Sequence, residues 1–342
     1  MLNPKSQIQI SNIKSRMKSF AILVVVLSFG FYILSLGVNA QQVSLSITPP
    51  LLELVIKPGK SIMVAYRIEN HGDPVIITTK LVNFEPKDNL GNIRLKNDLR
   101  GPMRFGLDNS ELQLERPFFL KTGASEQLLL RIRAPEGASP GDYYYTLLAE
   151  TSPTNSVSGT TGSMARASIG SNILVTITDS GVVEVKPKVV LFEVLNKLNI
   201  FGKKISVFDS FDKIPLIFVL ENKGRNLIKP EGEITLTGNF GEKLKYDIVP
   251  KNILAESQRL VEATPSSQLE TSHQQPLTLI LSGFFMGIYR LSTQVTFGEN
   301  SPTVFANTRF FAFPFKLLTG LLVVVAVAVY IIKRFSSKED ED

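Results

Sequence analysis

Residues 61–84 read SIMVAYRIENHGDPVIITTKLVNF, two apolar and β-branched runs on either side of a short polar stretch, Glu69-Asn70-His71-Gly72. Runs of this composition, separated by residues that favour turns, are typical of β-strands joined by a tight connection. A related pattern, IPLIFVLENKG, occupies residues 214–224 and ends in Glu221-Asn222-Lys223-Gly224. The two stretches predict strands in both halves of the chain.

Similar runs occur throughout the chain between residues 43 and 311, with no long stretch of helical periodicity among them. The predicted strands are Val43–Thr48, Leu51–Ile56, Ser61–Asn70, Val75–Phe84, Glu126–Ala134, Tyr143–Glu150, Ile173–Thr178, Val189–Leu195, Ile214–Asn222, Glu233–Thr237, Leu244–Val249, Leu277–Leu281, Tyr289–Phe297 and Val304–Phe311. About seven strands per half is the spacing of a β-sandwich. The sequence therefore predicts an all-β fold of two tandem immunoglobulin-like β-sandwich domains, residues 41–183 and 184–312, followed by one transmembrane helix.

Two short motifs recur at similar spacing in both halves, as expected of duplicated domains. An Asn-x-Gly motif closes a long strand, and a Gly-x-Tyr motif opens a late one. In the first motif we expect Asn to bond its own backbone and Gly to take a positive φ. The second resembles a tyrosine corner, in which a buried phenol bonds upstream backbone. The structural residues predicted in this way are Asn70, Gly72, Gly141, Tyr143, Asn222, Gly224, Gly287 and Tyr289.

Two apolar segments predict the membrane topology. Phe20–Val38 follows four basic residues and precedes Val38-Asn39-Ala40, the layout of a signal peptide over residues 1–40, although the run is long enough to span a bilayer uncut. Leu317–Ile332 is the core of a predicted transmembrane helix over residues 313–334. Lys316 separates this core from the aromatic residues that precede it. Basic residues follow it, so we expect residues 335–342 to form a cytoplasmic tail and the strands to lie outside the cell membrane.

The composition limits the chemistry available to the chain. It contains no Cys and no Trp, so disulfides and cysteine-bound metals are excluded. Between the two apolar segments, basic and acidic residues are nearly balanced and interspersed, which argues against a nucleic-acid groove. We expect no cofactor, and a Gram-positive-type bacterial or archaeal surface fits this cysteine-free exported chain better than a eukaryotic one.

Candidate catalytic and metal sites are few. The two histidines, His71 and His273, lie in a turn and in a polar loop, and neither has the setting of a zinc ligand or a catalytic triad. Ser210–Lys213 matches S-x-x-K and Lys121–Gly123 matches K-T-G, but they occur in reversed order and in different predicted domains. Asp88–Asn92 has oxygen ligands for Ca²⁺ but not the spacing of an EF-hand, and a hairpin loop is favoured. We predict that the protein is not an enzyme.

The segment Thr151–Ser171, TSPTNSVSGTTGSMARASIGS, is rich in Ser, Thr and Gly and joins two apolar strands. Long connections of this kind are either disordered or functional, so both disorder and contact with a partner remain open for it.

Several short motifs and their order along the chain carry a family resemblance: Lys57-Pro58-Gly59, Glu69-Asn70, Asn89–Ile93, Gly141–Tyr143, Glu221-Asn222, Pro230–Ile234, Gly287–Tyr289 and Phe313–Lys316. In these features the chain resembles the WxL-interacting cell-surface proteins of Gram-positive bacteria. The resemblance implies a peptidoglycan-binding first sandwich and a second sandwich that contacts a host or partner protein. Arg94 stands where that family has a Tyr, and the tail is acidic rather than rich in Lys.

The predicted function is that of a membrane-anchored, non-catalytic surface protein that binds cell-wall polymer or a partner surface protein through its sandwiches. Tyr143, Tyr144 and Tyr145 are candidates for stacking on sugars in a chain without Trp. The alternative is an assembly or chaperone-like protein that accepts a partner strand at a free sheet edge. A free edge without charge or Pro would favour this alternative. Besides these partners, we expect contact with the lipid bilayer through the C-terminal helix, and no nucleic acid.

Overall fold

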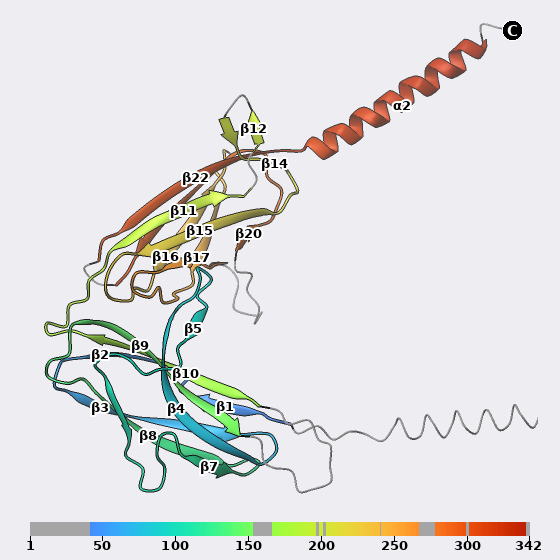
Figure 1. The fold of residues 1–342 in the computed structure, drawn as a ribbon. Coiled ribbons are helices and arrows are strands. Elements are labelled where there is room, and N and C mark those ends of the chain that lie inside the picture. The colour runs from blue at the N-terminus through green and yellow to red at the C-terminus, as the bar shows by residue number, and fades with distance from the viewer. Residues whose placement is uncertain are drawn as a thin grey trace, which may run out of the picture.

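The computed structural model describes residues 42–152, 166–195, 198–200, 203–239, 241–266, 278–298 and 301–339 (Figure 1). The predicted signal peptide, His273 and most of the Ser/Thr/Gly-rich segment lie outside these residues. The chain is mostly β-strand with one C-terminal helix, so the predicted all-β class is confirmed.

The first group of strands forms two sheets. One has the order β1-β3-β8-β6, and the other has the order β2-β10-β9-β4-β5, with β7 also paired to β4. The bounds are β1 Leu45–Thr48, β2 Leu51–Ile56, β3 Ser61–Asn70, β4 Val75–Pro86, β5 Ile93–Leu95, β6 Arg104–Leu107, β7 Pro117–Leu120, β8 Ser125–Arg133, β9 Gly141–Ser152 and β10 Ser168–Ile177. Strand β2 runs parallel to β10, and the other pairs are antiparallel.

The second group repeats this plan. One sheet has the order β11-β15-β18 with β20 also on β15, and the other has the order β14-β22-β21-β16-β17-β19. The bounds are β11 Pro187–Val194, β14 Val207–Asp209, β15 Ile214–Asn222, β16 Glu231–Thr237, β17 Lys243–Ile248, β18 Gln258–Leu260, β19 Ala263–Pro265, β20 Leu279–Leu281, β21 Gly287–Thr296 and β22 Val304–Phe313; a hairpin of β12 Leu198–Ile200 and β13 Lys203–Ile205 is inserted. Strand β14 runs parallel to β22, as β2 does to β10.

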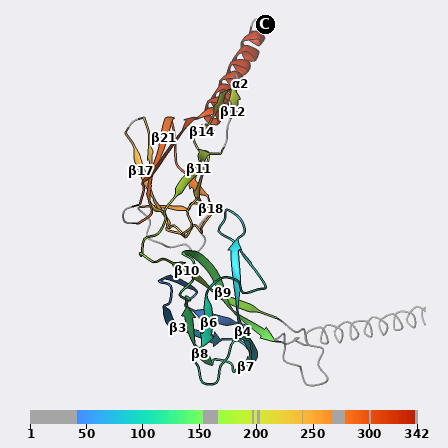
Figure 2. The same ribbon diagram turned by 60° about the vertical axis from the view of Figure 1, so that its left-hand side comes forward.

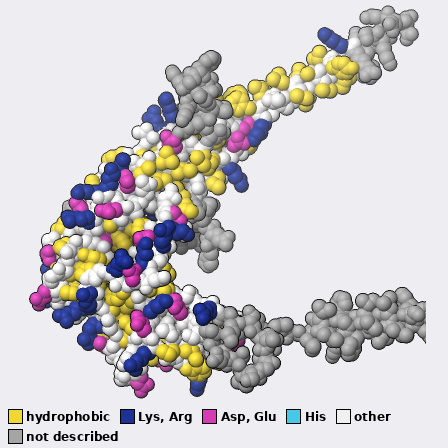
Figure 3. Space-filling view, viewed as in Figure 1, with side chains coloured by type: hydrophobic (Ala, Val, Ile, Leu, Met, Phe, Trp, Pro, Cys, Tyr) yellow, Lys and Arg dark blue, Asp and Glu magenta, His cyan; other side chains and the backbone are white. Residues whose placement is uncertain are grey.

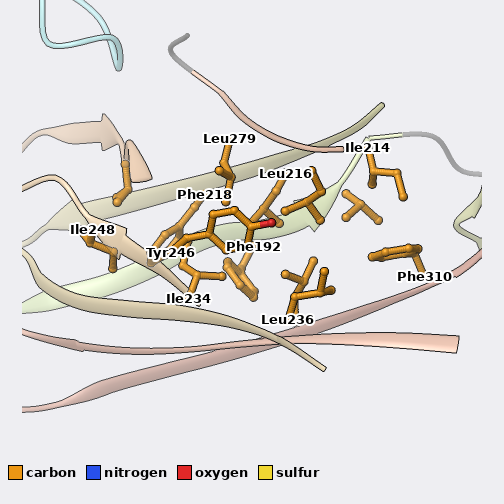
Figure 4. Close-up of a cluster of buried hydrophobic side chains, with 14 of the residues drawn as sticks. Phe192, Ile214, Leu216, Phe218, Ile234, Leu236, Tyr246, Ile248, Leu279 and Phe310 are labelled. Atoms are coloured by element: carbon orange, nitrogen blue, oxygen red, sulfur yellow. The ribbon is translucent and has the colours of Figure 1, made fainter. Parts of the chain in front are cut away.

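Each group encloses its own hydrophobic core, because alternate residues of the facing strands point inward. In the first core, Tyr66, Leu128 and Leu147 have no exposed surface. In the second, Phe218 and Phe310 are almost fully buried among Leu, Ile and Val side chains (Figure 4). We refer to the two groups as the first and second sandwich.

Helix α2, Phe315–Glu339, follows β22 directly and projects away from the second sandwich (Figures 1 and 2). Its residues Phe315–Lys333 are long and apolar enough to cross a membrane, with a mean hydropathy of 2.5. None of this stretch is buried against the sandwiches. It covers the predicted segment Leu317–Ile332, and its orientation across a membrane stays a prediction.

Eight observed strands have no counterpart among the predicted ones: β5, β6, β7, β12, β13, β14, β18 and β19. Each has only three or four residues, too few for an alternating pattern to be recognised. Six of them pair with a longer neighbour, as β7 does with the start of β4, whereas β12 and β13 pair with each other.

Candidate functional site: the cleft between the sandwiches

Asp142, at the start of β9, joins the two sandwiches. Its Oδ1 accepts hydrogen bonds from the Thr176 hydroxyl at 2.7 Å and from Asn226 Nδ2 at 2.8 Å. Its Oδ2 accepts from the backbone N–H of Leu227 and from the Tyr144 hydroxyl. Asn226 and Leu227 belong to the second sandwich, so the Asp142 carboxylate connects the first sandwich to the second. Hydrogen bonds to an ionised acceptor are the stronger kind.

Tyr144 forms the second bridge. Its ring stacks on Phe84 at 5.5 Å between centroids, and its hydroxyl accepts a hydrogen bond from the Ala255 N–H at 2.8 Å. Burial raises the pKa of the Tyr144 phenol, and the neighbouring Asp142 carboxylate raises it further. The phenol therefore stays protonated and continues to donate to Asp142.

Further contacts between the two sandwiches involve β2 and the connection between β4 and β5. Glu53 of β2 pairs with Lys229 at 3.2 Å and also accepts a hydrogen bond from Asn252. The Asn89 carbonyl accepts from the Leu260 N–H at 2.6 Å, which adds the β4–β5 connection to the interface. Gly91 in that connection has a φ of 85°, a conformation that favours glycine, and it lies against the Arg259 guanidinium.

A cavity of about 300 Å³ lies between these contacts. Its apolar lining includes Leu51, Phe84 and Leu174 of the first sandwich, and Pro250, Ile253 and Leu254 of the second. Its polar lining comes from both sandwiches and includes Glu53, Asp88, Asn92, Asn172, Lys229, Lys251, Asn252 and Arg259. This mixed lining suits a ligand that presents both apolar and polar groups.

Two buried polar atoms in this cleft, Arg259 Nε and Asn252 Oδ1, have no hydrogen-bond partner among the described residues. Burial lowers the pKa of Arg259, and nearby Glu262 opposes the shift. Buried donors and acceptors usually have partners, so this pair marks the cleft as a place where a ligand or water would be held.

The two predicted Asn-x-Gly motifs occupy matching places at the ends of β3 and β15. Asn70 and Asn222 are completely buried. Asn70 Nδ2 lies within hydrogen-bond distance of the Asp73, Leu120 and Lys121 carbonyl oxygens. Asn222 Nδ2 does the same with Asn226, Ile253 and Leu254. In both motifs, Oδ1 accepts from the N–H of the glycine two residues later, as expected.

The expectation that Gly72 and Gly224 take a positive φ is wrong, since neither is among the glycines with that conformation. Their requirement is steric instead. A Cβ on Gly72 would lie 2.2 Å from the Gln42 carbonyl oxygen, and one on Gly224 would lie 2.6 Å from that of Glu184. The chain that enters each sandwich passes too close for a side chain.

The two Gly-x-Tyr motifs open β9 and β21, and both Gly141 and Gly287 have positive φ. The Tyr143 hydroxyl donates to the Ser139 carbonyl at 3.0 Å, but the ring is partly exposed rather than largely buried. Tyr289 is 5% exposed, and its oxygen accepts from the Met286 N–H at 3.3 Å. The structural role of the eight motif residues stays a prediction, and the two tyrosines are not equivalent.

We expect this difference in a stability measurement. Tyr289→Ala should lower the free energy of unfolding by about 3–5 kcal/mol, because it leaves a cavity in the core. The ring it removes stacks on Phe310 at 5.3 Å. Tyr143→Ala should cost clearly less, because a partly exposed ring leaves no closed cavity and water replaces its lost hydrogen bond. Urea unfolding of both variants tests this, and equal losses would contradict it.

The three consecutive tyrosines do not form an exposed platform for sugars. Tyr145 is completely buried in the first core, and Tyr144 is occupied by the contact between the sandwiches. Successive residues of a strand point to opposite faces, so a run of three cannot present one surface.

The other sequence candidates lie in connections. Asp88–Asn92 joins β4 to β5, and Asp88 Oδ1 accepts from the N–H groups of Leu90 and Asn92, so the hairpin interpretation is confirmed. Ser210–Lys213 and Lys121–Gly123 are loops on different sandwiches. His71 contacts Ser46 and Glu69 at the surface. No group of three potential metal ligands occurs among the described residues.

Comparison with known proteins leaves the family open. No family model and no curated protein matches the chain. Solved structures that match include the class 5 fimbriae chaperone CfaA, with 11% identity and a TM-score of 0.37 over 78% of this chain and 99% of that one. The E. coli chaperone DraB matches with 14% identity and a TM-score of 0.32 over 78% and 96%. A Salmonella enterica complex of the SafA pilin with the SafB chaperone gives 10% and 0.32 over 78% and 98%. These values are too low to assign a function.

Proposed function

We propose that this chain is a membrane-anchored, extracytoplasmic protein of two tandem immunoglobulin-like domains that binds a partner surface protein. The partner's extended segment adds to the free edge of β2. This is the assembly or chaperone-like alternative described above, and the unprotected edge of β2 carries it.

The backbone of β2 supports this proposal. The Pro50 carbonyl accepts from the Asn172 N–H, and the Ile56 carbonyl accepts from the Thr178 N–H. Because hydrogen-bonded residues alternate along a parallel pair, the backbone groups of Leu51, Glu53 and Val55 point away from β10. Among the described residues, no strand pairs with that side. Three consecutive pairs of donors and acceptors are thus directed to an incoming strand.

The side chains of β2 also lack the usual protection. Edge strands normally carry charged residues or Pro that prevent pairing with another chain. Here Leu51 is 44% exposed and Val55 is 66% exposed, and the strand itself contains no Pro. Its single charge, Glu53, is paired with Lys229. Because Leu51 and Glu53 line the cleft, side chains of an added strand would reach the polar wall around Arg259.

Val55→Pro provides a sharp test. Proline removes the N–H of residue 55, which makes no bond to β10, so the pairing of β2 with β10 should be kept. A carbonyl of the added strand would lose this N–H as its hydrogen-bond donor. A photo-crosslinking residue is placed at Leu51 of the full-length protein, which is kept in the membrane of the cells that produce it. We expect this residue to capture a defined protein. Val55→Pro should reduce that product about tenfold, and Val55→Ala, which keeps the N–H, should reduce it much less. Equal crosslinking in both variants would exclude strand addition.

Cell-wall polymer in the cleft is a second candidate, in line with the resemblance to WxL-interacting proteins. The unpartnered Arg259 Nε and Asn252 Oδ1 favour it, because a polar polymer would supply their partners. Adding Arg259→Gln to these variants separates the two functions. Retention on purified peptidoglycan that is lost with Arg259→Gln and unchanged with Val55→Pro would favour the polymer.

A further inference from the structure

The first turn of α2 is fixed to one loop of the second sandwich, Asp209–Lys213. The buried carboxylate of Asp209 accepts a hydrogen bond from the Lys316 N–H at 2.9 Å and thereby caps the helix start. Asp212 pairs with the Lys316 ammonium. The Ser210 N–H also donates to the Phe313 carbonyl at 3.2 Å. Wherever the helix enters a membrane, this loop must lie at the membrane surface.

Large apolar side chains are exposed at the same end of the sandwich. Phe211 is 64% exposed and Phe284 is 54% exposed, with ring centroids 5.1 Å apart. Met286 and Ile288 are 46% and 53% exposed. The Phe285 N–H donates to the Ser210 carbonyl at 2.9 Å, which holds the two loops together. We call Phe211, Phe284, Met286 and Ile288 the apolar tip; hydrophobic surface continues from α2 onto the sandwich in Figure 3.

A pair of arginines lies directly behind the tip. Arg290 and Arg309 are opposite each other on β21 and β22, two residues further from the helix than the pair Ile288 and Phe311. Both are exposed, and neither forms an ion pair with a described residue. Like charges directly opposite in a sheet are destabilising. An anion placed between them would remove that cost.

We infer that the apolar tip enters the outer leaflet of the membrane that α2 crosses, while Arg290 and Arg309 bind the phosphates of anionic lipids. The inference rests on the proposed anchor. Two residues of a strand span about 7 Å, and the headgroup layer of one leaflet is roughly 5–8 Å thick. The arginine pair therefore lies at headgroup depth when the tip reaches the acyl chains. Aromatic side chains are the residues that favour this interface.

The absence of Trp from the sequence makes the test direct. Phe284→Trp and Phe211→Trp each give the full-length protein a single tryptophan at the tip. In nanodiscs of anionic phospholipid brominated near the headgroup, we expect blue-shifted and quenched emission from both variants. Phe305→Trp is the matched control, because Phe305 is 68% exposed at the opposite end of β22. It should remain unquenched.

A third variant separates failure of the anchor from failure of the inference. Val325→Trp, within α2, should be quenched by lipids brominated deep in the acyl chain. If it is not, the proposed anchor is wrong. If it is quenched while Phe284→Trp and Phe211→Trp are not, the anchor stands and the tip does not contact the membrane. The tip would then be free for a protein partner, which overturns the inference.

Lipid charge tests the arginine pair. Attraction to an anionic surface should favour the membrane-bound state of the tip by about fivefold for each nearby Arg. Two arginines should therefore shift the equilibrium between bound and unbound tip by roughly 30-fold. In the Phe284→Trp background, quenching should be stronger in anionic than in zwitterionic nanodiscs. Adding Arg290→Gln and Arg309→Gln should abolish that difference, whereas Lys188→Gln on β11 should not. Equal quenching in both lipids before the arginines are changed would contradict headgroup binding.

Discussion

Replacement of Asp142 by alanine is expected to release the two sandwiches from their fixed arrangement while each stays folded. The change removes the acceptor for Asn226 Nδ2 and for the Leu227 N–H, and it also leaves the Tyr144 hydroxyl without its acceptor. Hydrogen bonds to a charged group contribute about 1.5–3 kcal/mol each. Asp142 is partly exposed, so water compensates for some of the loss. We therefore expect the coupling between the sandwiches to fall by about 3 kcal/mol.

The distance between the sandwiches reports this change. The chain has no Cys, so spin labels can be attached at two introduced cysteines, Met63→Cys on β3 and Leu244→Cys on β17. Both positions are exposed. We expect a narrow distance distribution in the unchanged chain and a broad one with Asp142→Ala. Asp108→Ala is the control, because Asp108 pairs with Arg131 within the first sandwich. A narrow distribution that persists in Asp142→Ala would show that other contacts suffice.

The sequence predicted long strands well and the contacts between sandwiches poorly. The ends of β3 and β15 were predicted because apolar alternation stops at Asn70 and Asn222 in both. The sequence does not predict the role of Asp142, although it predicts the Gly-x-Tyr motif that contains it, because its partner Asn226 lies 84 positions away. Glu53 and Asn252 are 199 positions apart. A local pattern has no signal for such pairs, since each residue alone is compatible with an ordinary surface.

The same limit applies to the edge of β2. Its run LLELVI predicted a strand, and that prediction is confirmed. Whether such a strand is central or at an edge depends on the strands beside it, and periodicity does not report this. Its parallel partner β10 begins more than 110 positions later, beyond the reach of hairpin signals. The free edge of β2 is therefore identified from the strand order of the folded sheet and not from the sequence.

Replacement of either buried asparagine is expected to destabilise its own sandwich strongly. Asn70→Ala removes the Nδ2 donor to the buried Leu120 carbonyl and the Oδ1 acceptor of the buried Gly72 N–H. The Lys121 carbonyl keeps its bond from the Ala124 N–H. An unsatisfied buried group costs about 1–3 kcal/mol, so we expect a loss of about 3–5 kcal/mol from the first sandwich. Asn222→Ala should cost the second a similar amount. Hydrogen exchange of the full chain distinguishes them, because each variant should expose its own sandwich.

Asn109→Ala is a matched control. Asn109 also makes two hydrogen bonds to backbone, with Gln127 and Leu129, but its side chain is partly exposed. Water can replace both bonds, so we expect a loss of about 1 kcal/mol or less. If Asn70→Ala costs no more than Asn109→Ala, burial of the amide does not matter and the proposed structural role of Asn70 is wrong.

Asn70→Asp separates hydrogen bonding from size. The new side chain has the same shape, but a carboxylate has no donor and would face the oxygens that Nδ2 now contacts. Burial and those oxygens should raise the pKa of the introduced carboxyl above its value of about 3.9 in the unfolded chain. The variant should therefore be most stable below that unfolded value, where the protonated carboxyl donates, and should lose stability as the pH rises through the folded value. A difference from the unchanged chain that stays constant from pH 3 to 8, in urea unfolding, would contradict this account.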